Sequence, residues 1–180
     1  LLEIGLTGGM GSGKSTVGEM LTGRGAVLVD ADAIVRELQA PGAPVFEAMV
    51  ARWGADIVDT DGSLDRAEVA ERVFVDAAEL AALNSIVHPA VGKEIQRRRE
   101  ALTGTDATVI LDIPLLVESG YRDLDGVVVV DTELAVAVGR LVGQRGITEW
   151  DVRKRIAAQA SREERFAIAD VVLDNNGSID

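Results

Sequence analysis

The chain has 180 residues, of which 47% are hydrophobic, with a formal net charge of −12 and no cysteine. This length fits one domain with its own hydrophobic core, and the lack of cysteine excludes a disulfide framework or a thiolate metal site. So acidic a surface should repel nucleic acid, and no apolar run reaches the roughly 20 residues of a membrane helix. Because the N-terminus also lacks a secretory signal pattern, we expect a cytoplasmic protein that needs no nucleic acid, membrane or obligate protein partner.

Short apolar runs rich in β-branched residues predict five strands, and helical patterns separate them. The strands are expected at residues 2–7, 26–30, 108–112, 126–131 and 170–175. The helices are expected at 14–24, 32–40, 44–53, 65–74, 76–103 and 132–144, with two further helices starting at Thr148 and Ser161. Pro89 lacks an amide proton, so we expect it to interrupt the helix that Asp76 opens.

This alternation of strands and helices is typical of an α/β fold with a parallel five-stranded sheet flanked by helices on both faces. The helical stretch between the second and third strands is longer than a crossover connection needs. We therefore expect one domain with a helical insertion at about 33–104 and a helical lid at about 141–162. Its core is expected at about 1–32, 105–140 and 163–180.

The stretch GGMGSGKS contains the phosphate-loop pattern Gly8-x-x-x-x-Gly13-Lys14-Ser15, with a predicted strand before it and a helix after it. Glycines let successive backbone amides converge on an oxyanion. We expect Lys14 to reach the β- and γ-phosphates of ATP and the Ser15 hydroxyl to bind Mg²⁺. The predicted nucleotide-binding residues are Gly8, Gly9, Gly11, Ser12, Gly13, Lys14, Ser15 and Thr16. The sheet and this loop together predict the P-loop NTP hydrolase type of fold.

Three of the aspartates that follow or end predicted strands are candidates for a role in the chemistry, because ligands bind at this edge in sheets of this kind. Asp32 can act as the base that accepts a proton from an attacking hydroxyl, or it can cap the helix that follows it. Asp112 is the favoured Mg²⁺ ligand after the third strand. Asp131 competes for that role after the fourth strand, although it precedes a helix and could cap it.

Seven of the 18 basic residues lie between Arg140 and Arg165. Guanidinium groups stabilise the charge of a phosphoryl group in transfer, so Arg140 and Arg145 are candidates for that role in a lid that closes over the phosphates. The alternative is a solvated helix face of mixed charge, because acidic residues share the segment. His88 is the only histidine and precedes Pro89, so we expect it in a turn or at a helix junction.

The loop and the strand-end acids favour a small kinase. A GTPase would need an Asn-Lys-x-Asp motif to read guanine, and the chain has none. Another small-molecule or nucleotide kinase on the same scaffold remains an alternative, because a fold does not fix its substrate. A protein of another class, a switch that hydrolyses ATP slowly and signals to a partner, is the second alternative.

The motifs of nearly the whole chain, in their order, resemble the dephospho-coenzyme A kinase family. They are IGLTGGMGSGKSTV at 4–17, VDADAIVREL at 29–38, PGAP at 41–44, DGSLDRAEVAERVF at 61–74, LNSIVHPAV at 83–91, DIPLLVESG at 112–120 and AIADVVLDNNGS at 167–178. The resemblance implies transfer of the γ-phosphate of ATP to the ribose 3′-hydroxyl of dephospho-coenzyme A, the last step of coenzyme A synthesis. It also implies that the helical insertion binds this acceptor.

The same resemblance implies roles for individual residues. Asp32 is expected to be the base, Lys14 the phosphate clamp and Arg140 the arginine on the lid side. Asn175 and Gly177 are expected near the adenine. The implied acceptor-side residues are His88, Pro89, Leu115, Leu116 and Glu118. Family members usually continue into a closing helix, so we expect the natural chain to extend beyond Asp180.

Overall fold

The computed structural model describes residues 1–145 and 148–177. It divides into two compact units. The first comprises Leu1–Asp30 and Leu102–Asp180, and the second comprises Ala31–Ala101.

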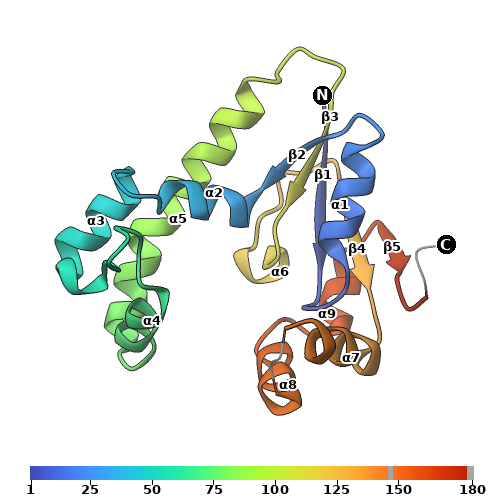
Figure 1. Cartoon of the computed structure of the whole chain (residues 1–180). Helices are drawn as coiled ribbons and strands as arrows, with labels where there is room; N and C mark the ends of the chain where they lie inside the picture. Colours follow the sequence, from blue (N-terminus) through green and yellow to red (C-terminus); the bar gives the residue numbers. More distant parts are fainter. Residues whose placement is uncertain (146–147, 178–180) are drawn as a thin grey trace. The chain divides into compact units, whose positions relative to one another are not determined.

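The first unit is built on a sheet whose five strands all run parallel, as the arrowheads in Figure 1 show. The strands are β1 (Leu2–Gly8), β2 (Val27–Asp30), β3 (Thr108–Asp112), β4 (Gly126–Asp131) and β5 (Val171–Asp174). Their order across the sheet is β2-β3-β1-β4-β5. The predicted five-stranded parallel sheet is therefore confirmed, and β1, which leads into the phosphate loop, lies at its centre.

Four of the five strands end on an aspartate, and these residues line the carboxyl edge of the sheet. Asp30 lies beside Asp112 in the register of β2 and β3, and Asp131 lies beside Asp174 in the register of β4 and β5. Aspartate is a poor strand residue, so it both ends the strand and projects at the edge where parallel sheets bind ligands. The central strand ends instead on Gly8, where a side chain would obstruct the loop.

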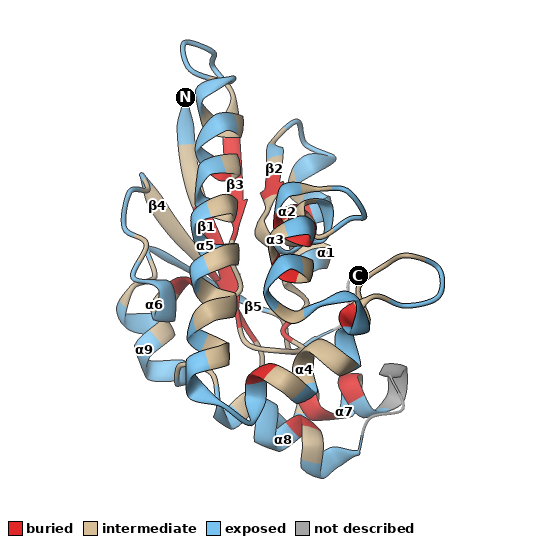
Figure 2. Ribbon diagram, turned by 90° about the vertical axis from the view of Figure 1, so that its left-hand side faces the viewer, coloured by how far each residue is buried: buried red, intermediate tan, exposed pale blue. Residues whose placement is uncertain are grey.

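Helices cover both faces of this sheet. On one face Val17 and Leu21 of α1 (Lys14–Thr22) pack against the buried core of Leu6, Ile110 and Val130. On the other face α6 (Leu116–Ser119) places the Leu116 side chain against Gly5 of β1. Buried residues accordingly follow the central strands in Figure 2, and exposed residues follow the outer sides of the helices.

Three helices in the C-terminal half complete the first unit: α7 (Leu134–Arg145), α8 (Glu149–Ala157) and α9 (Arg162–Ala167). Val138 and Leu141 of α7 pack with Val152 of α8, and Met10 of the phosphate loop joins this cluster. The helix start predicted at Ser161 is confirmed, and a capping box forms there, since Ser161 and Glu164 exchange side-chain-to-backbone hydrogen bonds. These helices therefore pack directly against the loop.

The second unit is helical, with α2 (Ala31–Leu38), α3 (Pro44–Trp53), the 3₁₀ helix η1 (Ala55–Ile57), α4 (Arg66–Phe74) and α5 (Ala77–Glu100). Its core is formed by the buried side chains of Val45, Met49 and Ile57. Asp65 caps α4 by accepting hydrogen bonds from the amides of residues 67 and 68.

The predicted interruption at Pro89 is wrong, because α5 continues through it. A proline inside a helix removes one backbone hydrogen bond and costs about 3 kcal/mol relative to alanine. Leu83, Ile86 and Val87, which precede the proline, pack against the core of the second unit. This packing holds the helix together, so His88 also lies within a helix and not in a turn as expected.

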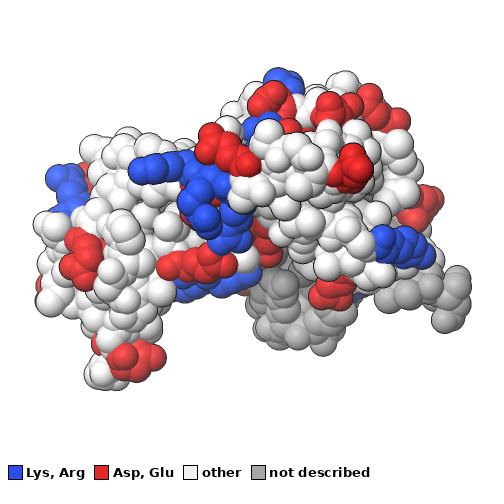
Figure 3. Space-filling model, turned by 90° about the horizontal axis from the view of Figure 1, so that it is seen from above, with Lys and Arg blue, Asp and Glu red and all other residues white. Residues whose placement is uncertain are grey.

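Basic side chains lie beside acidic ones on the face drawn in Figure 3. On α5 the Glu94 carboxylate accepts hydrogen bonds from Arg97 and Arg98, and Arg98 also pairs with Glu37. The surface therefore mixes both signs of charge here.

Candidate nucleotide-binding and phosphoryl-transfer site

The phosphate loop occupies the turn between β1 and α1 and depends on its glycines. Gly11 and Gly13 have φ angles of 79° and 85°, a left-handed conformation that disfavours side chains. A Cβ at Gly13 would also lie 2.2 Å from Asn175 Nδ2, and a Cβ at Gly8 would lie 2.6 Å from the Val130 carbonyl oxygen. The loop therefore requires glycine for its dihedral angles and for its close packing.

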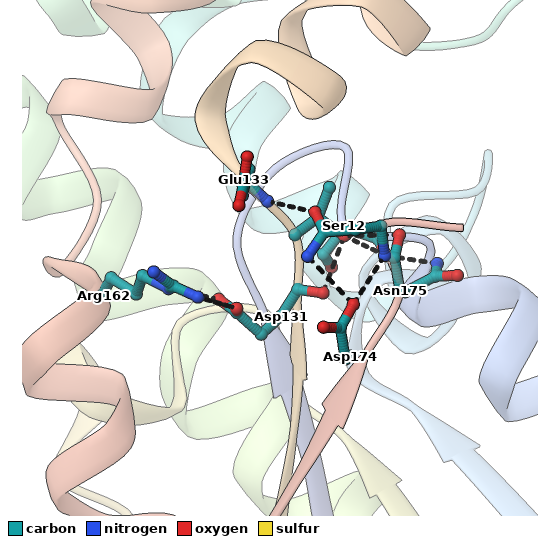
Figure 4. A network of polar contacts seen from close by, with 8 residues as sticks. Ser12, Asp131, Glu133, Arg162, Asp174 and Asn175 are labelled. Atoms are coloured by element: carbon teal, nitrogen blue, oxygen red, sulfur yellow. Dashed lines mark hydrogen bonds and ion pairs between the residues drawn. The ribbon is translucent and has the colours of Figure 1, made fainter.

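Side chains from the C-terminal half hold the loop in place. The Met10 amide donates a hydrogen bond to Gln159 Oε1 at 2.9 Å. The Ser12 carbonyl oxygen accepts hydrogen bonds from Asn175 Nδ2 at 2.7 Å and from the Thr132 hydroxyl at 3.2 Å. Figure 4 shows Asn175 reaching Ser12 from the end of β5. These bonds link the backbone of the loop to Gln159, Thr132 and Asn175 of the C-terminal half.

The Ser12 hydroxyl is buried inside the loop. Within the part of the chain that the structure describes, it is the one buried side-chain oxygen or nitrogen without a hydrogen-bond partner. Buried polar groups are nearly always satisfied in native proteins. Because this hydroxyl lies in the phosphate loop just before the N-terminus of α1, an oxygen of a bound phosphate is a fitting partner.

Lys14, in the first turn of α1, forms an ion pair with Asp112 at the end of β3. Both side chains are largely buried, with relative exposures of 15% for Lys14 and 5% for Asp112. A buried carboxylate must be compensated, and the lysine ammonium provides that compensation here.

The expected Mg²⁺ ligands, Ser15 and Asp112, offer a hydroxyl and a carboxylate oxygen. Among the described residues, no three His, Cys, Asp or Glu side chains gather into a metal site. Mg²⁺ at phosphate sites needs only one or two protein oxygens, since phosphate and water supply the others. The donor set present therefore fits this ion.

Asp131, the competing metal ligand, is instead bound to Arg162 of α9. Its carboxylate is buried, with 5% exposure, and accepts hydrogen bonds from Arg162 Nε at 2.9 and 3.1 Å. This partner raises the pKa of the guanidinium further above its usual value. Figure 4 shows the two side chains meeting beside the loop network. Asp131 does not cap α7 either, because that helix begins at Leu134.

Arg140 connects α7 to the segment that follows β5. Its Nη2 donates to the backbone oxygens of Asn175 at 2.9 Å and of Gly177 at 3.3 Å. Since Asn175 in turn contacts Ser12, the structure brings three predicted site residues, Arg140, Asn175 and Gly177, into one network with the loop. The side chain of Arg145, also predicted here, lies outside the described part of the chain.

A cavity of about 300 Å³ adjoins the loop in the first unit. Gly9 and Met10 form one wall, and Arg162 and Arg165 of α9 contribute to another. The Arg165 guanidinium lies so close to Gly9 that a Cβ there would be 3.1 Å from Nη2. Two members of the basic cluster therefore lie against the phosphate loop.

The predicted acceptor-side residues of the first unit have different environments. Leu115 is half exposed, whereas Leu116 is fully buried in the core beneath β1. Glu118 Oε1 accepts a hydrogen bond from the Ala160 amide at 2.8 Å, just before α9. Leu116 therefore contributes to packing, while Leu115 and Glu118 lie at the surface.

The predicted residues of the second unit are exposed. Asp32 is the second residue of α2, two positions after the end of β2. Because α2 begins at Ala31, Asp32 is inside the first turn and does not cap a helix that starts after it. His88 and Pro89 are exposed on α5.

Sequence reasoning missed Gln159, Thr132 and Arg162, all of which support the loop or its neighbouring strand end. Their contacts join residues 31 to 149 positions apart. No local pattern indicates such partners. The basic cluster between Arg140 and Arg165 was the only available signal for Arg162.

None of the helices in the described ranges has both the length and the apolar character that crossing a bilayer requires.

Comparisons with known proteins agree with this geometry. The family model described as dephospho-CoA kinase matches residues 2–180. A dephospho-CoA kinase of Streptomyces avermitilis is 52% identical over 98% of this chain and 86% of its own length. One of Corynebacterium glutamicum is 48% identical over 100% of this chain and 93% of its own length.

Two solved structures are also similar. The crystal structure of TT1252 from Thermus thermophilus is 35% identical, with a TM-score of 0.85 over 99% of this chain and 90% of its own. Dephospho-CoA kinase from Campylobacter jejuni is 23% identical, with a TM-score of 0.72 over 98% of this chain and 89% of its own, and thus has the same fold. The resemblance carried by the sequence motifs is confirmed, and the chain belongs to the dephospho-CoA kinase family.

Proposed function

We propose that the chain transfers the γ-phosphoryl group of ATP to the ribose 3′-hydroxyl of dephospho-coenzyme A, the last step of coenzyme A synthesis. The observation that carries this proposal is the phosphate loop with its buried, unpartnered Ser12 hydroxyl, in a chain of the dephospho-CoA kinase family. In the reaction the 3′-oxygen forms a bond to the γ-phosphorus as the bond to the β-phosphate oxygen breaks. The products are coenzyme A and ADP.

The donor is held by the first unit. The loop amides and the N-terminus of α1 bind the phosphates, and Lys14 exchanges its pairing with Asp112 for phosphate oxygens. The network of Arg140, Asn175 and Gly177 supports a place for adenine beside α7. Arg140 and Arg145 add positive charge on the lid side of the donor, which stabilises the transferred group.

Ser15 and Asp112 would hold Mg²⁺ through their oxygen atoms. When bound, this ion neutralises phosphate charge and orients the phosphates for transfer. Because Asp112 pairs with Lys14 in the structure, donor binding would release this carboxylate for the ion as the lysine turns to the phosphates.

The acceptor is assigned mainly to residues of the second unit, with Leu115 and Glu118 of the first unit, and the lid to residues 141–162. Asp32 takes the proton of the 3′-hydroxyl, a role its exposure and its place just beyond the strand end support. His88, Pro89, Leu115 and Glu118 complete the proposed acceptor side. The contacts of Gln159 and Arg162 with the core support a fixed C-terminal end of the lid.

The test is ADP release from Mg·ATP with four acceptors: dephospho-coenzyme A, AMP, shikimate and gluconate. We expect rapid release with the first acceptor alone, together with a stoichiometric yield of coenzyme A. Preference for another acceptor would indicate a different small-molecule kinase. ATP binding without stimulation by any acceptor would indicate a nucleotide switch, and either result would reject the proposal.

A further inference from the structure

Asp131 is a buried carboxylate that the proposed reaction does not use. It ends β4, whose register with β1 places Val130 beside Gly8 at the start of the phosphate loop. Arg162 binds this carboxylate through two guanidinium nitrogens, Nε and Nη2, as Figure 4 shows. The Phe166 ring adds a cation–π contact, with its centroid 5.0 Å from Arg162 Cζ. Arg162 is therefore committed to groups of the protein, and its pair with Asp131 fastens α9 to the sheet beside the loop.

Arg165 lies one turn further along α9 and faces the loop. Its Nη1 donates a hydrogen bond to the Ala160 carbonyl oxygen. Its Nη2 is the atom that a Cβ on Gly9 would meet first, at 3.1 Å. Within the part of the chain that the structure describes, Nη2 has no hydrogen-bond partner and Arg165 forms no ion pair. The adjacent Glu164 carboxylate is engaged in the capping box of α9, so Arg165 presents uncompensated positive charge to the loop.

The cavity of about 300 Å³ beside the loop has the character of an anion site. It is lined by Ser12, whose buried hydroxyl has no partner, and by both arginines of α9. Among the described residues of its lining, Asp131, Arg162 and Arg165 carry the charges. Because the first two neutralise each other, Arg165 leaves the cavity with one positive charge. A guanidinium of this kind binds phosphate oxygens by charge-assisted hydrogen bonds.

The two ends of the loop face different arginines. Arg140 lies at the Gly13 end, where its Nη1 would be 3.9 Å from a Cβ on Gly13. It also binds the backbone of Asn175, where the adenine is proposed to lie. Arg165 lies at the opposite end, against Gly9. A triphosphate that follows the loop from an adenine near Gly13 extends its terminal phosphate toward Gly9.

We propose that Arg165 is a catalytic residue that binds an oxygen of the γ-phosphate, and that Asp131 positions it by holding α9 through Arg162. The inference rests on the proposed function, which places ATP on the loop. A guanidinium fixed at the γ-phosphate stabilises the charge on the group in transfer. The positioning is firm, because release of Arg162 would leave Asp131 as an unpaired buried carboxylate.

The contact of Arg165 is tested by calorimetry on the intact chain with Mg²⁺ and two probes, ADP and the β,γ-imido analogue of ATP. The probes differ by the γ-phosphate. We expect Arg165→Met to weaken binding of the analogue about tenfold and to leave ADP within about twofold, because one charge-assisted hydrogen bond is lost. Arg165→Lys keeps the charge and should lose less. An equal loss with both probes, or a loss with neither, overturns the contact.

Arg24→Met is the matched control for Arg165→Met. Arg24 is an exposed arginine of the first unit and, like Arg165, donates to a backbone oxygen, that of Met20. This variant should bind both probes as the wild type does. A selective loss of the analogue in Arg24→Met would show that removal of any positive charge has this effect, and it would overturn the assignment to Arg165.

The positioning role is tested with Asp131→Asn, which removes the charge that holds Arg162. It should weaken the analogue about fivefold and leave ADP unchanged, whereas a merely structural role would weaken both probes. Combined with Arg165→Met it should cause no further loss, because Asp131 acts on the analogue through Arg165. Arg162→Lys, which loses the forked geometry, should show the same selective loss and decides the question if Asp131→Asn does not fold. Additive losses, or equal losses with both probes, overturn the positioning role.

These measurements need no acceptor, so their failure leaves the proposed function standing. Unchanged ADP affinity also shows that each variant has a folded loop. Turnover of dephospho-coenzyme A by the wild type is a separate readout, and its absence overturns the proposed function instead.

Discussion

Gln159 supports the phosphate loop through a single hydrogen bond, since its Oε1 accepts the Met10 amide proton. Replacing it by leucine removes the acceptor while keeping a similar volume. A hydrogen bond of this kind contributes about 1 kcal/mol, so Gln159→Leu should weaken ATP binding about fivefold. Calorimetric titration with ATP checks this, with Gln96→Leu on the exposed surface of α5 as the control. Equal ATP affinity of wild type and Gln159→Leu would show that the loop does not depend on this side chain.

Asp112 is the residue on which the proposed metal site depends. Asp112→Asn keeps the shape of the side chain but lowers its attraction for a divalent cation. We expect the variant to need at least tenfold more free Mg²⁺ for half-maximal turnover, because it lacks that negative charge. The measurement is the initial rate against free Mg²⁺ at saturating ATP. A half-saturating Mg²⁺ concentration equal to that of the wild type would show that Asp112 does not bind the ion.

At the residue scale, the sequence is informative where function depends on local pattern. Gly11 and Gly13 are predictable because a loop of converging amides needs left-handed backbone, and their φ angles confirm it. The Ser161–Glu164 capping box is equally local. The partners Gln159–Met10 and Arg162–Asp131 are not predictable, because folding brings them together from distant positions. The cap suggested for Asp32 is wrong because α2 begins at Ala31, so Asp32 already lies inside the helix.

At the scale of elements, α5 continues through a proline that should weaken it. Pro89 is exposed, and in an exposed helix interior alanine is more favourable than proline by about 3 kcal/mol. We expect Pro89→Ala to raise the free energy of unfolding by about 1–3 kcal/mol, since the lost backbone hydrogen bond is restored. Thermal unfolding measures the gain. If Pro89 contacts the acceptor as proposed, the KM for dephospho-coenzyme A should rise at the same time. A more stable variant with unchanged KM would exclude Pro89 from the acceptor site.

The same helix carries a pH-dependent contribution to stability. Hydrogen bonds from Arg97 and then from Arg98 lower the pKa of Glu94 from 4.5 to about 2. A carboxylate with a lowered pKa stabilises the fold above the pKa of the unfolded chain and loses that effect as pH falls through the folded value. Glu94→Gln should therefore be less stable than the wild type by about 1 kcal/mol at pH 7.

Thermal unfolding at pH 7, 5 and 3 checks this prediction for Glu94. The difference between wild type and Glu94→Gln should be similar at pH 7 and pH 5 and should shrink between about 4.5 and 2 as Glu94 becomes protonated. Glu68→Gln, which removes a carboxylate paired with Arg72 on α4, is a matched control variant. A difference that stays constant down to pH 3 would contradict the assigned role of the two arginines.

The predicted helices and strands are confirmed where the spacing of apolar residues and the capping residues agree. The prediction is wrong where tertiary packing outweighs a local rule. The five strands were predictable because they are short, apolar and separated by helical patterns. The continuity of α5 was not, because the contacts of Leu83, Ile86 and Val87 with the core offset the missing hydrogen bond at Pro89. The burial of Leu116 was not predictable either, since the sequence motif does not indicate which of Leu115 and Leu116 faces the sheet.

At the scale of the whole molecule, the proposed function divides donor binding and most of acceptor binding between the two units. The first unit contains the loop, Lys14 and the carboxyl edge of the sheet, which suit a triphosphate. The second contains Asp32, His88 and Pro89, which are proposed to act on the acceptor. Substitutions of loop residues in the first unit should therefore change the affinity for ATP far more than the affinity for the acceptor.

The most direct test of this account compares Asp32→Asn and Lys14→Ala for ATP affinity and for the rate of coenzyme A formation. We predict that Asp32→Asn binds ATP nearly as the wild type does but loses at least a hundredfold in turnover, because the 3′-hydroxyl has no base. Lys14→Ala should lose both ATP affinity and rate. Wild-type turnover by Asp32→Asn would contradict the account.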